Sequence, residues 1–222
     1  MGRMIKQNLL KILFILPCLL ALTYPLVHIW VVFPVYEQHL IENTEDDAIR
    51  VANHIISSFG LGEGDVSRES LSPRFAKEMD RVCRDFELEK LKVFSPSGEI
   101  VFSTNRSDIG NFNAHPYFAE VVAKGRNLTK FVSKDALTME GRLVKADVVE
   151  TYIPIMGSGS FGGALEIYFD ITKRNEAMKS SSLYLASLPF GLMLITLLSV
   201  TLIVVKTGKN GQLEIFSLPK IL

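Results

Sequence analysis

The sequence has little of what most enzymes use for chemistry. Its 222 residues contain two cysteines and four histidines. It has no HExxH helix, no glycine-framed serine, no phosphate-cradling glycine loop and no cysteine pairs spaced for zinc. Cys18 lies in a hydrophobic run and Cys83 in the polar middle of the chain, so no disulfide can form within that middle part. The sequence therefore predicts no enzyme, no cofactor and no metal site.

Net charge is also lacking, because 24 basic residues balance 24 acidic residues. The balance is uneven along the chain: residues 36–180 contain 18 Lys and Arg against 23 Asp and Glu, a net charge of −5. No block of Lys or Arg with interleaved aromatics is present, although nucleic-acid binding depends on such a basic patch. We therefore expect no nucleic-acid partner.

The sequence does contain two long hydrophobic runs, residues 9–33 and 183–205. At about 1.5 Å per residue, each is long enough to cross a hydrocarbon core roughly 30 Å thick. The first run could instead be a secretory signal, but it is longer than a signal core of roughly 7 to 15 residues and no small-x-small site follows it. We interpret both runs as transmembrane helices and the first as an uncleaved anchor in the lipid bilayer.

Basic residues predict the orientation of these spans. Arg3, Lys6 and Lys11 precede or begin the first span, and Lys206 and Lys209 follow the second. Because positive charge favours the cytoplasmic side, both termini are expected there. The predicted organisation is a cytoplasmic N-terminus (1–8), a span (9–33), an outer domain (36–173), a linker (174–182), a second span (183–205) and a cytoplasmic tail (206–222).

The outer domain begins with helical patterns. Ala48, Ala52, Ile55 and Phe59 form one stripe of a helix that continues out of the membrane, with a bend or a new start tolerated at Pro34. A second helix is predicted after the cap residue Ser72, with proline in its first turn.

The pattern then changes to the alternation of strands. Two strands, 88–94 and 99–104, form a hairpin around SPSG, and a short helix follows in NAHPYFAEVVAKG. Three further strands are expected at 128–133, 141–156 and 162–172. About five antiparallel strands with helices against them make an α+β fold.

At this point the sequence resembles a known family. LKVFSPSGEIVFSTNRSDIGNFNAHPYFAEVVAKG, followed by a strand and by GGALEIYFDIT, is similar to the extracytoplasmic Cache (PAS-like) sensor region of bacterial histidine kinases, diguanylate cyclases and chemoreceptors. The resemblance covers roughly residues 36–173 and includes the long leading helix and both flanking spans. It implies a single Cache domain in the periplasm or outside the cell, held in the bacterial inner membrane by two spans.

The resemblance also implies a function in signal transduction, for example in a two-component system. A small molecule would bind between the sheet and the connecting segments, and the long helix would pass the signal through the membrane. A homodimer with this helix at its interface is implied, as is a cytoplasmic signalling partner or a missing effector domain. Relatives carry the kinase or cyclase in their cytoplasmic part, and this chain has none after its second span.

His115 is the first candidate ligand-binding residue. In amino-acid-sensing relatives an arginine opens the corresponding helix, and here His115 stands in that place before Pro116. Histidine lacks the bidentate fork of arginine, which weakens the expectation of an amino-acid ligand. A helix start offers free backbone donors to an anion, so an anionic ligand such as an organic acid is expected, although His115 could simply cap a surface helix.

The other candidates follow from their places on the helix and strands. Tyr117 and Phe118 could contact a ligand or pack in the core, and Lys130 and Tyr152 lie on strands that should line the pocket. Asp170 resembles a family residue at the end of the last strand but could equally cap the following helix. Two alternatives to a ligand sensor remain: an anchored protein-interaction domain, and a truncated fragment of a sensor kinase or cyclase.

Overall fold

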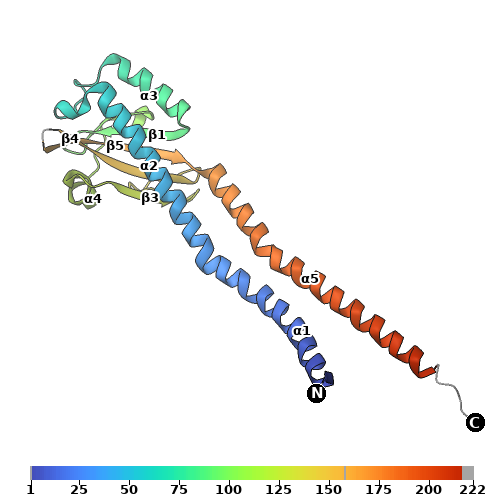
Figure 1. Ribbon diagram of the computed structural model, residues 1–222. Helices are drawn as coiled ribbons and strands as arrows, with labels where there is room; N and C mark the ends of the chain where they lie inside the picture. Colours follow the sequence, from blue (N-terminus) through green and yellow to red (C-terminus); the bar gives the residue numbers. More distant parts are fainter. Residues whose placement is uncertain (1, 158, 217–222) are drawn as a thin grey trace, which may run out of the picture. The chain divides into compact units, whose positions relative to one another are not determined.

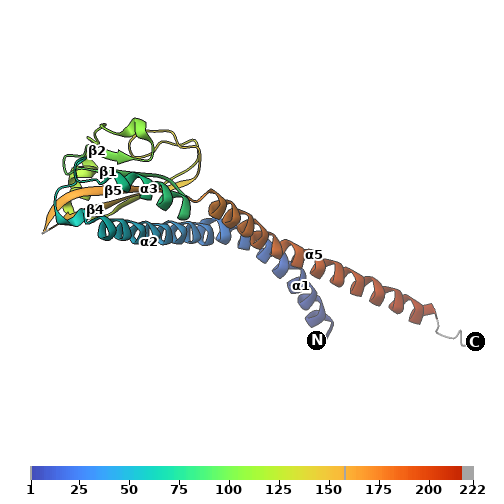
Figure 2. The ribbon, with the colours of Figure 1, turned by 90° about the horizontal axis from the view of Figure 1, so that it is seen from above.

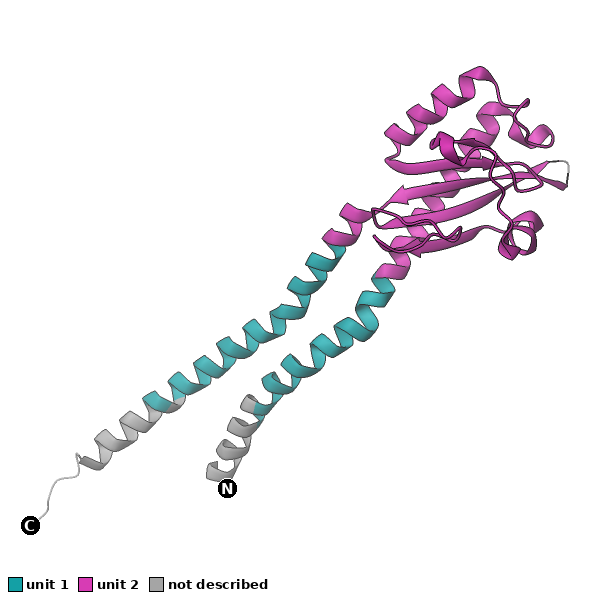
Figure 3. Cartoon of the chain, turned by 180° about the vertical axis from the view of Figure 1, so that it is seen from behind, with its two compact units in different colours: residues 1–36, 178–222 teal, residues 37–177 magenta. Residues whose placement is uncertain are grey.

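The computed structural model describes residues 2–157 and 159–216. The chain separates into two compact units, which are coloured in Figure 3: residues 1–36 with 178–222, and residues 37–177. The second unit contains every strand, so the fold that positions a site is described within it.

The helices flanking this unit are long and apolar. The first helical stretch comprises α1 (Gly2–Val27), a π-helical turn η1 (His28–Val32) and α2 (Phe33–Phe59), and the last helix is α5 (Thr172–Phe216). The ranges Ile15–Phe59 and Thr172–Ile203 contain windows of mean hydropathy 2.0 and 2.1, so by length and composition each could cross a membrane. The π-helical turn lies just before Pro34, where the missing N–H would otherwise interrupt a regular helix. The linker expected at 174–182 forms part of α5.

The remaining elements alternate between short helices and strands (Figure 1). They are η2 (Leu61–Glu63), α3 (Pro73–Asp85), β1 (Leu88–Phe94), β2 (Ile100–Ser103), η3 (Arg106–Asp108), α4 (Pro116–Glu120), η4 (Val122–Lys124), β3 (Leu128–Val132), β4 (Val148–Gly157) and β5 (Ser160–Asp170). The five strands form one antiparallel sheet in the order β2-β1-β5-β4-β3. The expected α+β class, with a five-stranded antiparallel sheet and a long N-terminal helix, is confirmed.

The two faces of the sheet differ in chemistry. Figure 2 shows α2 on one side of the sheet, where alternate strand residues meet α2 and α3 in the main hydrophobic core. This side buries Leu165, Ile167 and Phe169 of β5. The residues between them, Glu166 and Tyr168, point to the opposite side because successive side chains of a strand alternate. The second side carries the candidate site.

The long strand predicted at 141–156 begins only at Val148. Residues 133–147 instead form an irregular segment, which we call the cover, closed on itself by an isolated bridge between Leu137 and Leu143. Gly141, where the predicted strand would begin, adopts a positive φ angle of 77°, which a regular strand does not allow. The prediction was therefore wrong for residues 141–147, whose pattern resembles the start of a strand, and right for the remainder.

Ser72 occupies the N-cap position of α3, but its side chain makes no capping hydrogen bond. The first turn is closed instead by the backbone, where Phe75 N–H donates to the Ser72 carbonyl at 2.9 Å. The predicted start of the helix is therefore right and the expected side-chain cap is wrong.

One close backbone approach fixes the position of β5 against β1. Gly163 has a φ of 145°, and a Cβ placed on it would lie 2.4 Å from the Phe94 carbonyl oxygen. No side chain fits at that distance, so glycine is required where the hairpin between β4 and β5 turns beside β1.

Candidate functional site

Five polar side chains are buried on the second side of the sheet, which we call the polar face. They come from β1, β4 and β5, and none is more than 1% exposed: Lys92, Glu150, Tyr152, Glu166 and Tyr168. The strand register brings them together, since Glu166 pairs with Lys92 on one side and with Tyr152 on the other. Charged groups are rarely buried so completely unless they are paired. The polar face is therefore a feature that hydrophobic packing alone does not explain.

Tyr168 lies at the centre of the polar contacts. Its hydroxyl oxygen is 2.7 Å from Glu166 Oε1 and 3.1 Å from Glu150 Oε1. Lys92 Nζ lies 2.8 Å from Glu166 Oε2 and 3.4 Å from the Tyr168 hydroxyl. The Lys92 ammonium is thus the positive charge held between these carboxylates.

The cover lies over this group and contributes a third carboxylate. Glu140 pairs with Lys92, and Met139 N–H donates to Glu150 Oε2 at 2.9 Å. Arg142 pairs with the buried Asp108 of η3, and its Nε lies 3.8 Å from Glu140 Oε2. Ionic contacts therefore tie the cover both to the sheet and to η3.

Burial and like charge set the pKa values on the polar face. Burial raises the pKa of Glu166 to about 7, with Glu150 adding to the rise and Lys92 opposing it. Burial and Glu166 likewise raise the pKa of Glu140. Burial lowers the pKa of Lys92, but Glu166 and Glu140 raise it more, so this lysine stays charged. Glu140 and Glu166 therefore hold protons more tightly than exposed glutamates do, while the Lys92 ammonium is retained.

At one edge of the polar face, α4 adds aromatic and amide groups. Asn113 Nδ2 donates to the hydroxyls of Tyr117 and Tyr152 at 3.1 and 3.3 Å, and these hydroxyls lie 3.2 Å apart. His115, at the N-cap of α4, is exposed and stacks on the Tyr117 ring with centroids 5.4 Å apart. Polar groups thus continue from the surface at His115 to the buried Tyr152.

The structure brings together four of the six residues predicted to bind a ligand. His115 and Tyr117 lie at the surface edge, Tyr152 lies beneath them, and Phe118 packs in the adjoining hydrophobic cluster. Lys130 pairs with Glu150 in the strand register and so lies on the same side of the sheet, but its side chain is exposed and its Nζ donates to the Leu137 carbonyl of the cover at 3.4 Å. Asp170 is exposed and accepts a hydrogen bond from the N–H of Thr172, the first residue of α5, at 2.8 Å. This contact agrees with the alternative that Asp170 caps the following helix. Whether any of the six binds a ligand stays a prediction.

Sequence reasoning did not select Lys92, Glu140, Glu150 or Glu166. The available signal was a charged residue at an alternate position inside an otherwise apolar strand, as in LEKLKVF, VVETYIPI and ALEIYF. Such a residue normally indicates the solvent side of a half-buried sheet. Here that side is closed by the cover, of which residues 141–147 were predicted to belong to a strand.

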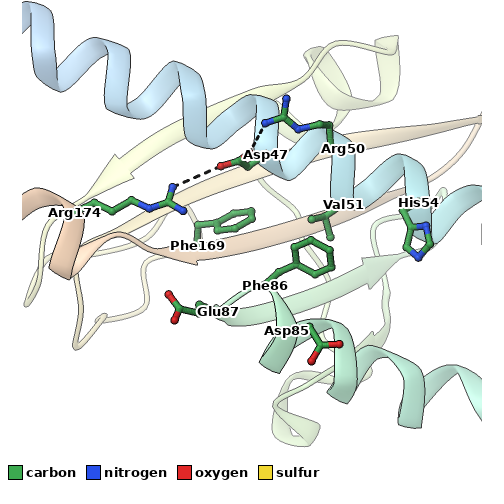
Figure 4. A pocket seen from close by; sticks show the side chains of 9 residues that line it. All are labelled: Asp47, Arg50, Val51, His54, Asp85, Phe86, Glu87, Phe169 and Arg174. Atoms are coloured by element: carbon green, nitrogen blue, oxygen red, sulfur yellow. Dashed lines mark hydrogen bonds and ion pairs between the residues drawn. The ribbon is translucent and has the colours of Figure 1, made fainter.

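A separate pocket of about 450 Å³ lies on the side of the sheet that carries α2 (Figure 4). Asp47 of α2 is bridged there by Arg50 and by Arg174 of α5, with Arg174 Nη1 3.5 Å from Asp47 Oδ2. Asp85 and Glu87 add negative charge, and the Phe86 ring is 47% exposed. This mixed-charge pocket shares no residue with the polar face.

Among the side chains that the structure describes, no three His, Cys, Asp or Glu residues are arranged to hold a metal ion. The carboxylates of the polar face surround an ammonium instead.

The raised pKa of Glu166 predicts a dependence of stability on pH. The stabilisation from the bound proton is fully present below the ordinary pKa of 4.5 and is lost as the pH rises through about 7. Between pH 5 and 8, the free energy of unfolding of the wild type should therefore fall, relative to Glu166→Gln, by on the order of 2 kcal/mol. Urea denaturation at each pH measures this difference. Glu89→Gln, an exposed change on β1, should follow the wild type, and parallel curves for wild type and Glu166→Gln would contradict the assignment.

Comparison with known proteins adds likenesses to solved structures only. No protein-family model and no curated protein matches the chain. The chain is similar to the sensor domain of the histidine kinase DctB from V. cholerae, with 14% identity and a TM-score of 0.36 over 62% of this chain and 58% of that chain. It is also similar to the E. coli DcuS sensor domain (11%, TM-score 0.40, 63% of this chain and 97% of that chain).

A third similar structure is an extracellular ligand-binding receptor from Desulfohalobium retbaense, with 11% identity and a TM-score of 0.44 over 69% of this chain and 27% of that chain. The matched part thus spans less than two thirds of the DctB domain and about a quarter of the receptor. Two of these descriptions name sensor domains, and the third names an extracellular ligand-binding receptor. We base the functional argument on the residues of this chain.

Proposed function

We propose that residues 37–177 form the extracytoplasmic sensor domain of a bacterial signal-transduction protein, anchored in the inner membrane by the spans at 9–33 and 183–205. The buried polar face beneath the cover carries this proposal. Burying two glutamates and a lysine is costly for folding, and buried titratable groups with shifted pKa values are typical of functional sites. Such a domain would act as a sensor and not as an enzyme.

The small-molecule ligand would bind at the edge where α4 meets the polar face. His115 is exposed there, and the hydroxyls of Tyr117 and Tyr152 offer hydrogen bonds directly behind it. An anion would bind at the surface beside the His115 ring, because the glutamates deeper in the polar face would repel it. α4 has only five residues, so its N-terminal field adds little to this attraction.

The signal would travel through the helices that leave the domain. A ligand can shift the spans only by its different affinity for two arrangements of the protein. We propose a homodimer through α2 as the moving unit, acting on a cytoplasmic partner or an effector domain.

Thermal unfolding of the full chain in detergent tests the ligand-binding part. Organic acids, amines, amino acids and purines are added at fixed pH. A ligand at 100 times its dissociation constant should stabilise the domain by about 2.7 kcal/mol, a shift of several degrees. His115→Ala should reduce the shift given by an anion.

His54→Ala is the matched control, because His54 is also exposed but lines the pocket of Figure 4. A shift lost in His54→Ala and kept in His115→Ala would move the ligand to that pocket. No shift with any class would contradict a small-molecule sensor. It would favour the anchored protein-interaction domain, for which the exposed Phe86 in the mixed-charge pocket is the supporting observation.

A further inference from the structure

The polar face has too few donor hydrogens to satisfy the hydrogen-bond contacts among its oxygen atoms. The Tyr168 hydroxyl has one hydrogen, yet its oxygen lies within hydrogen-bond distance of two carboxylate oxygens, on Glu166 and Glu150. If both carboxylates are ionised, one of these oxygens faces the hydroxyl oxygen without a hydrogen between them. One further proton on a carboxyl group removes this conflict.

Glu166 is the place where that proton fits. Its side chain is fully buried and its Oε2 lies 2.8 Å from the Lys92 ammonium, so the oxygen free to take a proton is Oε1, which lies 2.7 Å from the Tyr168 hydroxyl oxygen. A proton added at Oε1 makes a donor to the Tyr168 oxygen, and the Tyr168 hydrogen then donates to Glu150 Oε1. The proton comes from solvent, no bond other than O–H forms, and the charge of the group rises by one.

We propose that the stimulus of this sensor domain is the proton, taken up by Glu166 in the hydrogen-bonded group with Tyr168 and Glu150 and detected through the cover. The inference rests on the proposed sensor function and identifies the stimulus that acts on its polar face.

The group is enclosed by charges from every neighbouring element, and they set its affinity for protons. Burial and Glu150 raise the pKa of Glu166, while Lys92 lowers it. The titratable and charged groups that face it are Lys90 and Lys92 of β1, Glu150 and Tyr152 of β4, Tyr168 of β5, Glu140 and Arg142 of the cover, Asp108 of η3, and Tyr117 of α4.

Proton uptake changes the hold on the cover through Glu140. With Glu166 ionised, the ammonium of Lys92 is shared between Glu166 and Glu140, and Glu166 repels Glu140. With Glu166 neutral, this repulsion disappears and Lys92 pairs with Glu140 alone. The cover is therefore held more tightly in acid and more loosely in alkali.

The far end of the cover is bonded to the start of α5. The Asp147 carbonyl accepts a hydrogen bond from Ile171 N–H at 2.9 Å, and its Oδ2 accepts one from Asn175 Nδ2 at 2.6 Å. Asp147 N–H in turn donates to Thr172 Oγ1 at 3.1 Å. A change in the order of the cover thus reaches the first turn of the helix that leaves the domain.

The test uses the full chain in lipid nanodiscs between pH 5 and 9. Infrared difference spectra should show the C=O stretch of a protonated, buried carboxylic acid, which disappears as the pH rises through about 7. Amide hydrogen exchange, corrected for the intrinsic effect of pH, should be about tenfold slower in 133–147 at the acid end. Tenfold corresponds to one pKa unit of coupling. Exchange in α3, which packs in the main hydrophobic core on the other side of the sheet, should not change.

Glu166→Gln should remove the titrating band and keep the cover in its slowly exchanging state at every pH. Glu89→Gln should titrate like the wild type. If Glu166→Gln does not fold, Glu150→Gln serves instead. It keeps Glu166 but removes the neighbouring negative charge, so the band should disappear at a lower pH.

A band that persists in Glu166→Gln, or that does not change with pH in the wild type, overturns the inference. An amide exchange rate in residues 133–147 that does not change with pH, after the intrinsic correction, also overturns it. A small-molecule shift in the thermal experiment without any of these pH effects would leave the sensor proposal standing and remove only proton sensing. The pH effects without any ligand shift would support proton sensing and remove the small-molecule ligand.

Discussion

Lys92→Met should destabilise the outer domain by about 3–5 kcal/mol at pH 8. The methionine has a similar length, but it removes the ammonium between Glu166 and Glu140 and leaves their carboxylates buried without their positive partner. At pH 5 the loss should be smaller, because Glu166 can then be neutral. Without the ammonium the carboxylate pKa values rise further, so stability should fall more steeply with pH than in the wild type. Urea denaturation of the full chain at both pH values measures the difference.

Lys130→Met is the matched control, because Lys130 is exposed on β3 and its Nζ donates to the backbone carbonyl of Leu137 at 3.4 Å. This variant should lose no more than about 0.5 kcal/mol, as is usual for surface changes. Equal stability of Lys92→Met and wild type at pH 8 would show that the lysine is not the charge that holds the polar face together.

Gly163→Ala should destabilise the domain by about 3 kcal/mol or more. The added Cβ would lie 2.4 Å from the Phe94 carbonyl oxygen in the neighbouring strand β1, and its other neighbour is the side chain of Val66 at 3.2 Å. The backbone of β1 or β5 must move to make room, and the φ of 145° adds strain for any residue with a Cβ. Thermal unfolding should show the loss as a lowered melting temperature of the domain.

Gly141→Ala separates strain from collision. Gly141 also has a positive φ, 77°, but a Cβ there would meet nothing within 4 Å. This variant should lose only about 1 kcal/mol, from backbone strain alone. A similar loss in both variants would mean that the close approach to Phe94 contributes little.

The helices and strands of the domain can be predicted from the sequence wherever the spacing of apolar residues fits only one type of secondary structure. The stripe of Ala48, Ala52 and Ile55 predicts α2, and the turn residues Pro96 and Gly98 predict the hairpin of β1 and β2. The order of the strands in the sheet was beyond sequence reasoning, because β1 pairs with β5 across more than sixty residues. Such a pairing depends on the whole core and leaves no local pattern.

The candidate site was predicted only at its edge. His115 and Tyr117 were found because a proline and two aromatics at a helix start are conspicuous in the sequence. Lys92, Glu150 and Glu166 were missed because an alternating charge within a strand normally faces water. Here residues 133–147 exclude water, and because residues 141–147 were predicted as strand, no segment was expected to cover the polar face.

The alternation along β5 has a consequence for how this domain can change in evolution or design. Leu165, Ile167 and Phe169 belong to the hydrophobic core, and Glu166 and Tyr168 belong to the polar face. One residue inserted or deleted within β5 would exchange the two sets of side chains beyond that point. It would place a glutamate in the hydrophobic core of the domain and a leucine on the polar face. The length of β5 is therefore fixed by both faces at once, and changes in chain length are confined to turns such as the one between β4 and β5.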